Sequence, residues 1–161
     1  MTKCNILEAI SLTEDLAKQG NRQNTKIVNP ETGKLSFGII PKNRIIESGE
    51  IYLRLGFVGV GRDLAGGFGA RHILDKHSKD LSLSEFSDVP SVVAALLLEG
   101  CKVLVDFNKG GDDKPIVLNT SKGMVVLTKK GLSGAIEYSI VSAYGRTNHP
   151  GTVVATLKKP E

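Results

Sequence analysis

The sequence predicts an α+β fold in which N-terminal helices pack on a mainly antiparallel sheet of four or more strands. Helical periodicity is concentrated before residue 100, whereas a period of two prevails after it. The later strands are joined by short connections that carry glycine, which is typical of an antiparallel meander. The chain has 161 residues, 40% of them hydrophobic, so a single domain over 1–161 is expected.

The N-terminal third is expected to hold one helix and two strands. Apolar residues at roughly helical spacing predict a helix over 5–19, and alternation predicts strands over 35–40 and 51–60. An alternative interpretation of residues 1–34 is an N-terminal extension, or the remnant of a delivery segment of a larger protein.

A buried helix and a run of strands are expected after residue 87. Asp88 as the capping residue and Pro90 in the first turn predict the start of the helix, and 91–99 is nearly all apolar before Gly100. A turn is expected at 108–113. The predicted strands are 103–107, 116–118, 124–127, 136–143 and 153–157.

The stretch from 64 to 77 gathers most of the groups that could move a proton or bind a phosphate. Glycines at 66, 67 and 69 predict a turn, and the residues from Ala70 onward are compatible with a helix. This short helix carries two of the three histidines, together with Arg71 and Lys76. The rest of the chain is expected to hold this segment against the sheet.

Helix geometry separates the two histidines. At about 100° per residue, His72 and His77 point roughly 140° apart, which excludes the zinc-binding pair of the i, i+4 type. His77 shares the apolar side with Ile73 and Leu74, so we expect it to be a core residue. His72 lies on the polar side, where it is either a catalytic acid or base or an ordinary surface histidine.

Several classes of site are excluded by their missing motifs. The glycines lack the lysine of a phosphate-binding loop and the third glycine of a dinucleotide-binding turn, so no nucleotide cofactor is expected. No carboxylate pair suggests glycoside chemistry, because Asp112 and Asp113 are interpreted as a solvated turn. With no metal-binding spacing either, the expected site uses neither metal nor cofactor.

The end of the longest late strand offers a second set of polar groups. Ser142 and Tyr144 are two residues apart and therefore face the same side, and Arg146 follows them. Together with the helix residues, they could cleave a phosphodiester through the ribose 2′-hydroxyl, with a base, an acid and cations around the phosphate. The competing interpretation is a strand end entering a polar loop. His149, before a Pro-Gly pair, is interpreted as a turn residue.

Composition favours an anionic partner without proving one. The net charge is +4, and residues 101–161, with nine Lys/Arg against five Asp/Glu, account for all of it. This suits RNA, although a basic surface of no special function explains it equally well. Aromatic residues make up only 5%, fewer than is usual for proteins that stack many bases. Two distant cysteines, no signal-peptide pattern and no long apolar run indicate a soluble protein of a reducing, cytoplasmic setting.

The run from Gly66 to His77, Gly-Gly-Phe-Gly-Ala-Arg-His-Ile-Leu-Asp-Lys-His, resembles the histidine motif of the barnase/EndoU/colicin/RelE-like (BECR) nuclease superfamily of phages and toxins. The resemblance covers about residues 35–147. Later segments match the family in the same order, and they are 88–90 with the helix that follows, 115–118, 123–126 and 138–144.

The resemblance implies a metal-independent endoribonuclease with helices on a four-stranded antiparallel sheet. It implies catalytic roles for His72, Ser142 and Arg71, with Ser142 replacing the family's usual threonine. Tyr144 and His77 lie in the matched segments and are expected to contact the substrate, and Lys76 and Arg146 are expected to do so as cations beside them. Many members are toxins of phages or of contact-dependent growth inhibition. An RNA substrate such as tRNA, an immunity protein and action in the cytoplasm of a target bacterial cell are therefore expected, with delivery as part of a larger secreted protein.

Two other functions remain open from the sequence. A catalytically silent module of the same fold would bind RNA or a protein without cleavage. An ADP-ribosyl transferase ranks lower, because no nicotinamide-site pattern is present.

Overall fold

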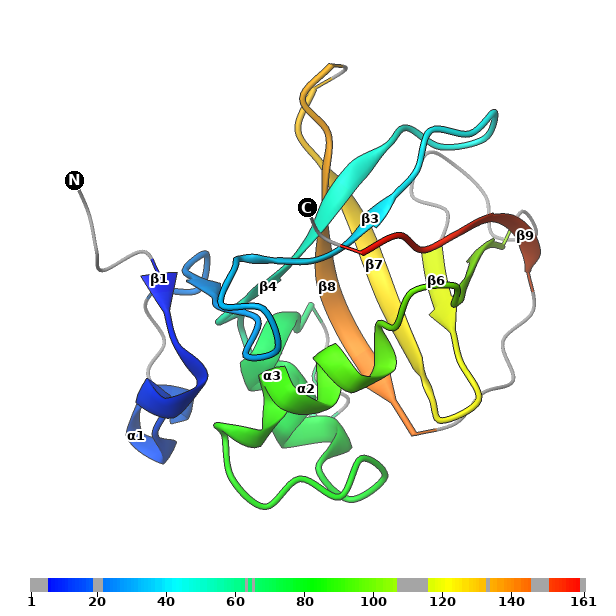
Figure 1. The fold of residues 1–161 in the computed structure, drawn as a ribbon. Helices are drawn as coiled ribbons and strands as arrows, with labels where there is room; N and C mark the ends of the chain where they lie inside the picture. The colour runs from blue at the N-terminus through cyan, green and yellow to red at the C-terminus, as the bar shows by residue number, and fades with distance from the viewer. Residues whose placement is uncertain are drawn as a thin grey trace.

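The structure is a computed structural model that describes residues 6–18, 22–62, 64, 66–106, 116–132, 134–145 and 151–159 (Figure 1). The predicted α+β class is confirmed, with few helices and one large sheet. The described elements are β1 (Ile6–Leu7), the 3₁₀ helix η2 (Ala9–Ser11), α1 (Glu14–Lys18), β2 (Lys26–Ile27), β3 (Ser36–Ile40), β4 (Gly49–Arg54), α2 (Gly69–His77), α3 (Asp88–Leu96), β5 (Lys102–Val105), β6 (Ile116–Asn119), β7 (Met124–Lys130), β8 (Glu137–Tyr144) and β9 (Thr152–Thr156).

The strands lie in the order β1-β2-β4-β8-β7-β6-β5-β9, and β3 pairs with β4 beside this path. The consecutive strands β5, β6, β7 and β8 form the predicted antiparallel meander. The meander does not continue into β9, which pairs with β5 instead, and β8 pairs on its other side with β4 in parallel. Beyond β9, Lys158 forms a bridge with Ile39 of β3, so the C-terminal segment connects the β9 end of the strand order to β3.

The predicted N-terminal helix over 5–19 is wrong for most of its length. Residues 6 and 7 instead form a parallel strand pair with β2, and only a single α-helical turn, α1, follows. The apolar stripe is not one buried face, because Ile6 is 48% exposed and Ile10 is 88% exposed while Leu12 and Leu16 are buried. Sheet pairing at the edge of β2 therefore overrides a weak helical pattern.

The predicted strand over 51–60 ends earlier, at Arg54. Gly56 has φ of +85°, a conformation that favours glycine, and a Cβ there would collide with the carbonyl oxygen of Phe68. The chain turns away at this point, and Phe57 then pairs with Phe68 across the base of the glycine-rich loop. This turn brings the start of α2 against the end of β4.

The helix predicted after residue 87 is present as α3 and is largely buried, with Val89 and Val93 fully inaccessible. Asp88 does not cap it in the predicted way. Its carboxylate accepts hydrogen bonds from the backbone N–H groups of Ser84 (3.0 Å) and Glu85 (2.9 Å), so it stabilises the turn before the helix. The helix ends at Leu96, before the expected boundary at Glu99.

A β-bulge in β8 decides which side chains face the core. Val126 of β7 pairs with Ser142, but the next residue, Leu127, pairs with Ile140, so Val141 is the extra residue. Neighbouring residues of β7 face opposite sides, so Ile140 and Ser142 also face opposite sides despite their spacing of two. Ile140 is buried in the core, and Ser142 lies on the other face of the sheet.

We call that other face the polar face of β4 and β8. Strand pairing places Glu50 beside Glu137 and Tyr52 beside Ser139, and alternation adds the remaining positions of the two strands. Its members are Glu50, Tyr52 and Arg54 of β4 and Glu137, Ser139, Ser142 and Tyr144 of β8.

The core lies on the opposite side of the sheet, where α2 and α3 gather beside β8 (Figure 1). Ala70 and Ile73 of α2 and Val89 of α3 are completely buried there. Tyr138 of β8 is also fully buried, and its hydroxyl donates to the Glu47 carbonyl (2.6 Å), which ties the β3–β4 loop to the sheet. Among the described residues, no helix is long and apolar enough to cross a membrane.

Candidate functional site

The glycine-rich turn places α2 against the end of β4, and the helix predicted from Ala70 begins one residue earlier, at Gly69. Gly69 has φ of +77°, and a Cβ there would lie 2.6 Å from the carbonyl oxygen of Arg54. The backbone therefore passes too close to β4 for any residue other than glycine. The N–H of Arg71 then donates to the carbonyl of Leu55 (2.9 Å), so the first turn of α2 is bound directly to the end of that strand.

His72 is held in one tautomer by the loop before the helix. Its Nδ1 lies 2.8 Å from the carbonyl oxygen of Val58, and because a carbonyl only accepts, Nδ1 carries the hydrogen. In the neutral ring the lone pair is then on Nε2. Gly67 makes this contact possible, because a Cβ at this position would collide with both His72 Nδ1 and the Val58 oxygen. The residue is 5% exposed, so it is buried, contrary to the polar-side position predicted from the helical wheel.

The two histidines lie close together, although a separation of 140° around the helix predicted rings that point apart. Their ring centroids are 6.0 Å apart, and the His77 ring also meets Tyr144 of β8 edge to face at 4.2 Å. The loop after α2 closes the arrangement. Asp80 lies 3.5 Å from His77 Nδ1 through one carboxylate oxygen, and its other oxygen accepts the N–H of Gly145 at 2.7 Å. The end of α2 and the end of β8 are thereby joined.

His77 is a core residue, as the sequence predicted, with 6% exposure. Burial lowers the pKa of its imidazole below the usual value, and the Asp80 carboxylate opposes this in part. Its Nε2 is sealed from solvent and has no hydrogen-bond partner among the described residues. The ring is therefore neutral near pH 7.

Ser142 and Tyr144 share the polar face, as their spacing predicted. Ser142 is 2% exposed, and its hydroxyl oxygen has no hydrogen-bond partner among the described residues. A buried hydroxyl without a partner is uncommon, and such groups often mark functional positions. The structure thus brings one side of α2, with its two histidines, to the end of β8 that carries Ser142 and Tyr144.

Arg71 has a structural role in place of the predicted phosphate contact. It is only 2% exposed, its Nε donates to the Leu16 carbonyl (3.1 Å), and its Nη1 donates to the Gly56 carbonyl (2.9 Å). The guanidinium therefore ties α1, the end of β4 and α2 together. Burial also lowers its pKa, with Arg22 adding to the effect. The Arg71 guanidinium therefore stabilises the fold and is not exposed to a substrate in this structure.

Of the remaining residues that the sequence singled out, the structure describes some and not others. Lys76 is exposed on α2, one residue before His77. Arg146, His149 and the turn expected at 108–113 lie outside the described residues. Among the residues that are described, no group of three or more His, Cys, Asp or Glu side chains could hold a metal ion.

Sequence reasoning missed four residues around this site. Asp80 follows His77 by three positions, a spacing that could have been tested for a carboxylate partner. Arg54 lies between Leu53 and Leu55, and Ser139 lies between two core residues of β8. Polar residues within otherwise apolar strands were the available signal. The carbonyl of Val58 left no signal, since it depends on the course of the loop.

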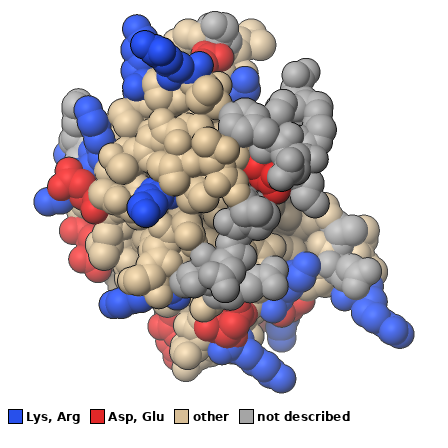
Figure 2. Space-filling view, turned by 90° about the vertical axis from the view of Figure 1, so that its right-hand side faces the viewer, with Lys and Arg blue, Asp and Glu red and all other residues tan. Residues whose placement is uncertain are grey.

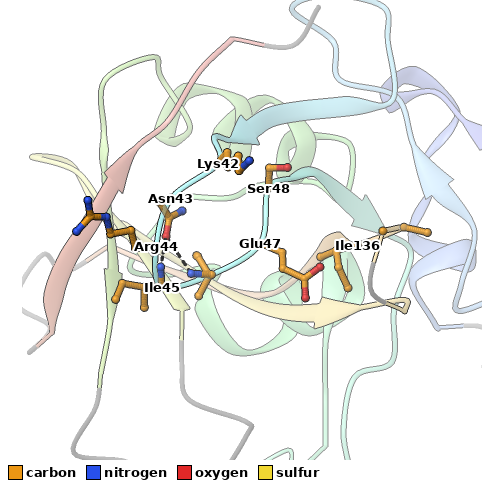
Figure 3. Close-up of a pocket in the computed structure, with 10 residues that line it drawn as sticks. Lys42, Asn43, Arg44, Ile45, Glu47, Ser48 and Ile136 are labelled. Carbon is orange, nitrogen blue, oxygen red and sulfur yellow. Dashed lines mark hydrogen bonds between the residues drawn. The ribbon is translucent and has the colours of Figure 1, made fainter.

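Two pockets lined by described residues lie away from these side chains. One of about 550 Å³ is formed by residues 42–48 of the β3–β4 loop and 134–136 of the β7–β8 connection (Figure 3). It adjoins the start of β8, whereas His77 contacts Tyr144 at the other end, roughly 20 Å along the strand. A second pocket, of about 540 Å³, includes Cys101 and Asn119. Burial raises the pKa of the Cys101 thiol to about 11, so it is not a nucleophile at neutral pH.

The basic charge does not gather into one patch on the face drawn in Figure 2. Lysines and arginines are scattered there around a largely uncharged centre, and acidic residues lie among them. The net charge of +4 therefore gives this face no continuous track for a phosphate backbone.

Comparisons of the chain with protein-family models, with curated proteins and with solved structures gave no match.

We expect Arg71→Met to destabilise the chain by roughly 2–4 kcal/mol, because it leaves two buried carbonyl groups without their donor. Urea unfolding followed by circular dichroism measures the change. Arg44→Met is the matched control, since Arg44 is exposed and its loss should change stability by less than about 0.5 kcal/mol. Equal stability of the two variants would contradict the structural role of Arg71.

The lowered pKa of His77 makes stability depend on pH. The unfolded chain binds a proton at His77 near pH 6.5, whereas the folded chain does so only at lower pH. The free energy of unfolding should therefore fall as pH drops through 6.5, with His77 contributing at most about 1.4 kcal/mol per pH unit. His77→Asn should show a shallower dependence between pH 7.5 and 5.5 in urea titrations. An unchanged slope would show that His77 titrates alike in both states.

Proposed function

We propose that the chain is a metal-independent endoribonuclease that cleaves RNA by attack of a ribose 2′-hydroxyl on the adjacent phosphate. The attack breaks the bond to the 5′-oxygen and leaves a 2′,3′-cyclic phosphate on one fragment. His72 takes the proton of the 2′-hydroxyl, the departing 5′-oxygen takes up a proton from solvent water, and His72 then returns its proton to the solvent. The nucleophile belongs to the substrate, so the protein supplies only a base, hydrogen-bond donors and positive charge.

The observation that carries this proposal is the fixed tautomer of His72. A general base needs a ring nitrogen with a lone pair and a partner that orients the ring. The Val58 carbonyl, 2.8 Å from Nδ1, provides the orientation and leaves Nε2 as the basic nitrogen. His77 lies next to it, 6.0 Å between centroids, and connects it to Tyr144.

Two groups on the polar face are assigned to the phosphate and its neighbourhood. Ser142 has a hydroxyl without a partner among the described residues, which can donate to a phosphate oxygen. Tyr144 lies on the same face and is assigned a substrate contact. Lys76 is exposed on α2 and supplies a cation to the RNA backbone. Arg71 is left out of the substrate site because its guanidinium binds backbone carbonyls.

The burial of these groups favours a second candidate, a silent module that binds RNA or a protein without cleaving it. His72 is 5% exposed and Ser142 is 2% exposed, so a substrate must displace part of the surrounding chain to reach them. A module would not need that movement. The two candidates differ in a simple product test, because only the nuclease generates cyclic phosphate ends.

The biological setting follows from the same proposal. The resemblance of residues 66–77 to the histidine motif of toxin nucleases supports a role as a toxin that acts on cytoplasmic RNA of a target cell. Such a toxin needs an immunity protein in the producing cell. Expression of the chain from a tightly repressed promoter, with and without His72→Ala, tests toxicity directly. Growth arrest should require the histidine.

We expect His72→Ala to lower the rate of RNA cleavage by about 10²–10⁴, the usual contribution of a general base. The assay uses a fluorescent RNA with a chelator present, and mass spectrometry identifies the 2′,3′-cyclic phosphate. Arg44→Gln removes an exposed charge in the loop of Figure 3 and serves as a control with wild-type rate.

An unchanged rate in His72→Ala would refute the assignment of His72. If the wild-type chain yields no fragments but binds RNA with an affinity that falls steeply with salt, the silent module is correct.

Gly67→Ala tests whether the loop positions His72. The added Cβ would collide with His72 Nδ1 and the Val58 oxygen, while the backbone of Gly67 does not have the positive φ that requires glycine. We expect the loss of most of the cleavage rate with little change in KM, because the ring is displaced and the RNA contacts remain. A wild-type cleavage rate, or a loss that appears in KM and not in kcat, would contradict this positioning role.

A further inference from the structure

We infer that Arg54 and Ser139 form a subsite for a second RNA phosphate, beside the scissile phosphate that Ser142 is proposed to contact. That the ligand is RNA rests on the proposed function. That the subsite binds a phosphate group does not depend on the proposed function, and it can be measured separately.

The subsite starts from two buried polar groups that lack partners among the described residues. Arg54 is 8% exposed, and its Nη1 is sealed from solvent with no hydrogen bond. Ser139 is 1% exposed, and its hydroxyl is likewise without a hydrogen bond. Both groups are donors, and both cost stability while they remain unpaired. A ligand that offers several acceptor oxygens, as a phosphate does, would satisfy the two of them together.

Strand pairing places the two groups on one face. Ser139 pairs with Tyr52, and Arg54 follows Tyr52 by two residues, so both belong to the polar face of β4 and β8. The Arg54 side chain reaches back along the strand to Glu137, whose carboxylate accepts from Nη2 at 2.6 Å. One side of the guanidinium is therefore fixed by an ion pair. The other side, with Nη1, is left for a ligand.

The charges around the subsite favour an anion. Lys26 lies 3.9 Å from the Glu137 carboxylate and 3.9 Å from the centre of the Tyr52 ring. Lys130 pairs with Glu137 across β7 and β8, so it also lies on this side. The three cations Lys26, Arg54 and Lys130 outnumber the two carboxylates of Glu50 and Glu137. The local balance is thus one positive charge.

The bulge of β8 aligns this subsite with the proposed reaction centre. Ser139 and Ser142 are three residues apart and would face opposite sides of a regular strand. Because Val141 is the extra residue, both hydroxyls lie on the polar face, roughly 7–10 Å apart along the strand. Neighbouring phosphates of one RNA chain can span such a separation. The substrate class implied is single-stranded RNA with at least two phosphates bound.

Phe68 is the residue assigned to cover the proposed subsite. Its ring centre lies 5.9 Å from the Lys130 ammonium, so the ring leans toward the same side of the sheet. The residue is half-buried and directly precedes α2. In the proposed subsite, rotation of this ring gives a phosphate access to Arg54 and Ser139, and such a side-chain motion is fast.

Titration of the full chain with inorganic phosphate, followed by calorimetry, tests the subsite without any cleavage. We expect Ser139→Ala and Arg54→Gln each to weaken binding at least about tenfold, because each removes a donor to a charged group. Phe68→Ala should strengthen it. Arg44→Gln, the exposed control, should leave it unchanged. Ser139→Ala removes an unpaired buried hydroxyl, so its melting temperature should stay level or rise, which separates weaker binding from unfolding.

Wild-type affinity in Ser139→Ala, an equal loss in Arg44→Gln, or no phosphate binding by the wild-type chain would each overturn the subsite. The RNA source is tested with 2′-O-methyl oligonucleotides, which cannot be cleaved by 2′-hydroxyl attack. Arg54→Gln should weaken the binding of a trinucleotide, which has two phosphates, more than that of a dinucleotide, which has one.

The subsite and the nuclease can fail separately. Phosphate binding that depends on Arg54 and Ser139 in a chain that cuts no RNA would keep the subsite and refute the nuclease. Cleavage that depends on His72, with unchanged KM for the trinucleotide in Ser139→Ala, would keep the nuclease and refute the subsite.

Discussion

The extra residue Val141 in β8 is the constraint on which the site depends. A regular strand would alternate strictly, and Ser142 would then face the core together with Ile140. With the bulge, Ile140 still packs in the core while Ser142 joins Ser139 on the polar face. The same irregularity coincides with the point where β8 leaves β4, since the two strands pair only through Ser139. The helix α2 contacts both strands beyond this point and brings its histidines to the sheet.

Unpaired polar atoms concentrate around this junction. The described residues leave the hydroxyls of Ser139 and Ser142, Nε2 of His77, and nitrogens of Arg54 and Arg71 without hydrogen bonds while sealed from solvent. Each such atom costs stability, and most proteins keep few of them. These five residues belong to α2, β4 or β8, whereas a sixth such atom among the described residues, Oδ1 of Asn119, lies on β6. Violations of local rules that cluster in this way are expected where a chain gives up stability for function.

Much of the architecture could be predicted, because alternation and turn chemistry are local. The strands from β5 to β8 and the helices α2 and α3 follow from the period of apolar residues and from glycine and proline positions. The N-terminal segment could not, since its apolar spacing is equally compatible with edge pairing to β2. The pairing of strands that are distant in sequence could not be predicted either. Nothing in the sequence of β4 or β9 indicates that β4 pairs with β8 in parallel or that β9 pairs with β5.

The sequence identified several residues of the candidate site but did not predict how they contact one another. The sequence drew attention to His72, His77, Ser142 and Tyr144, and the structure places the two histidines beside Tyr144, at the end of β8 that also carries Ser142. It could not show that Arg71 is bound to backbone carbonyls, because those carbonyls belong to Leu16 and Gly56, far away in sequence. For the same reason the sequence did not show that Arg54, within an otherwise apolar strand, forms an ion pair with Glu137 on the polar face.

The lowered pKa of His77 has a consequence for its neighbour. A histidine 6.0 Å away that was itself charged would oppose the uptake of a proton by His72. Burial keeps His77 neutral near pH 7, even though the Asp80 carboxylate draws it toward the charged form. In the proposed mechanism, His72 therefore takes the 2′-hydroxyl proton beside a neutral ring, with its own Nδ1 hydrogen donated to the Val58 carbonyl. The close pair of imidazoles is thus compatible with one base, provided that the second ring stays buried against Tyr144.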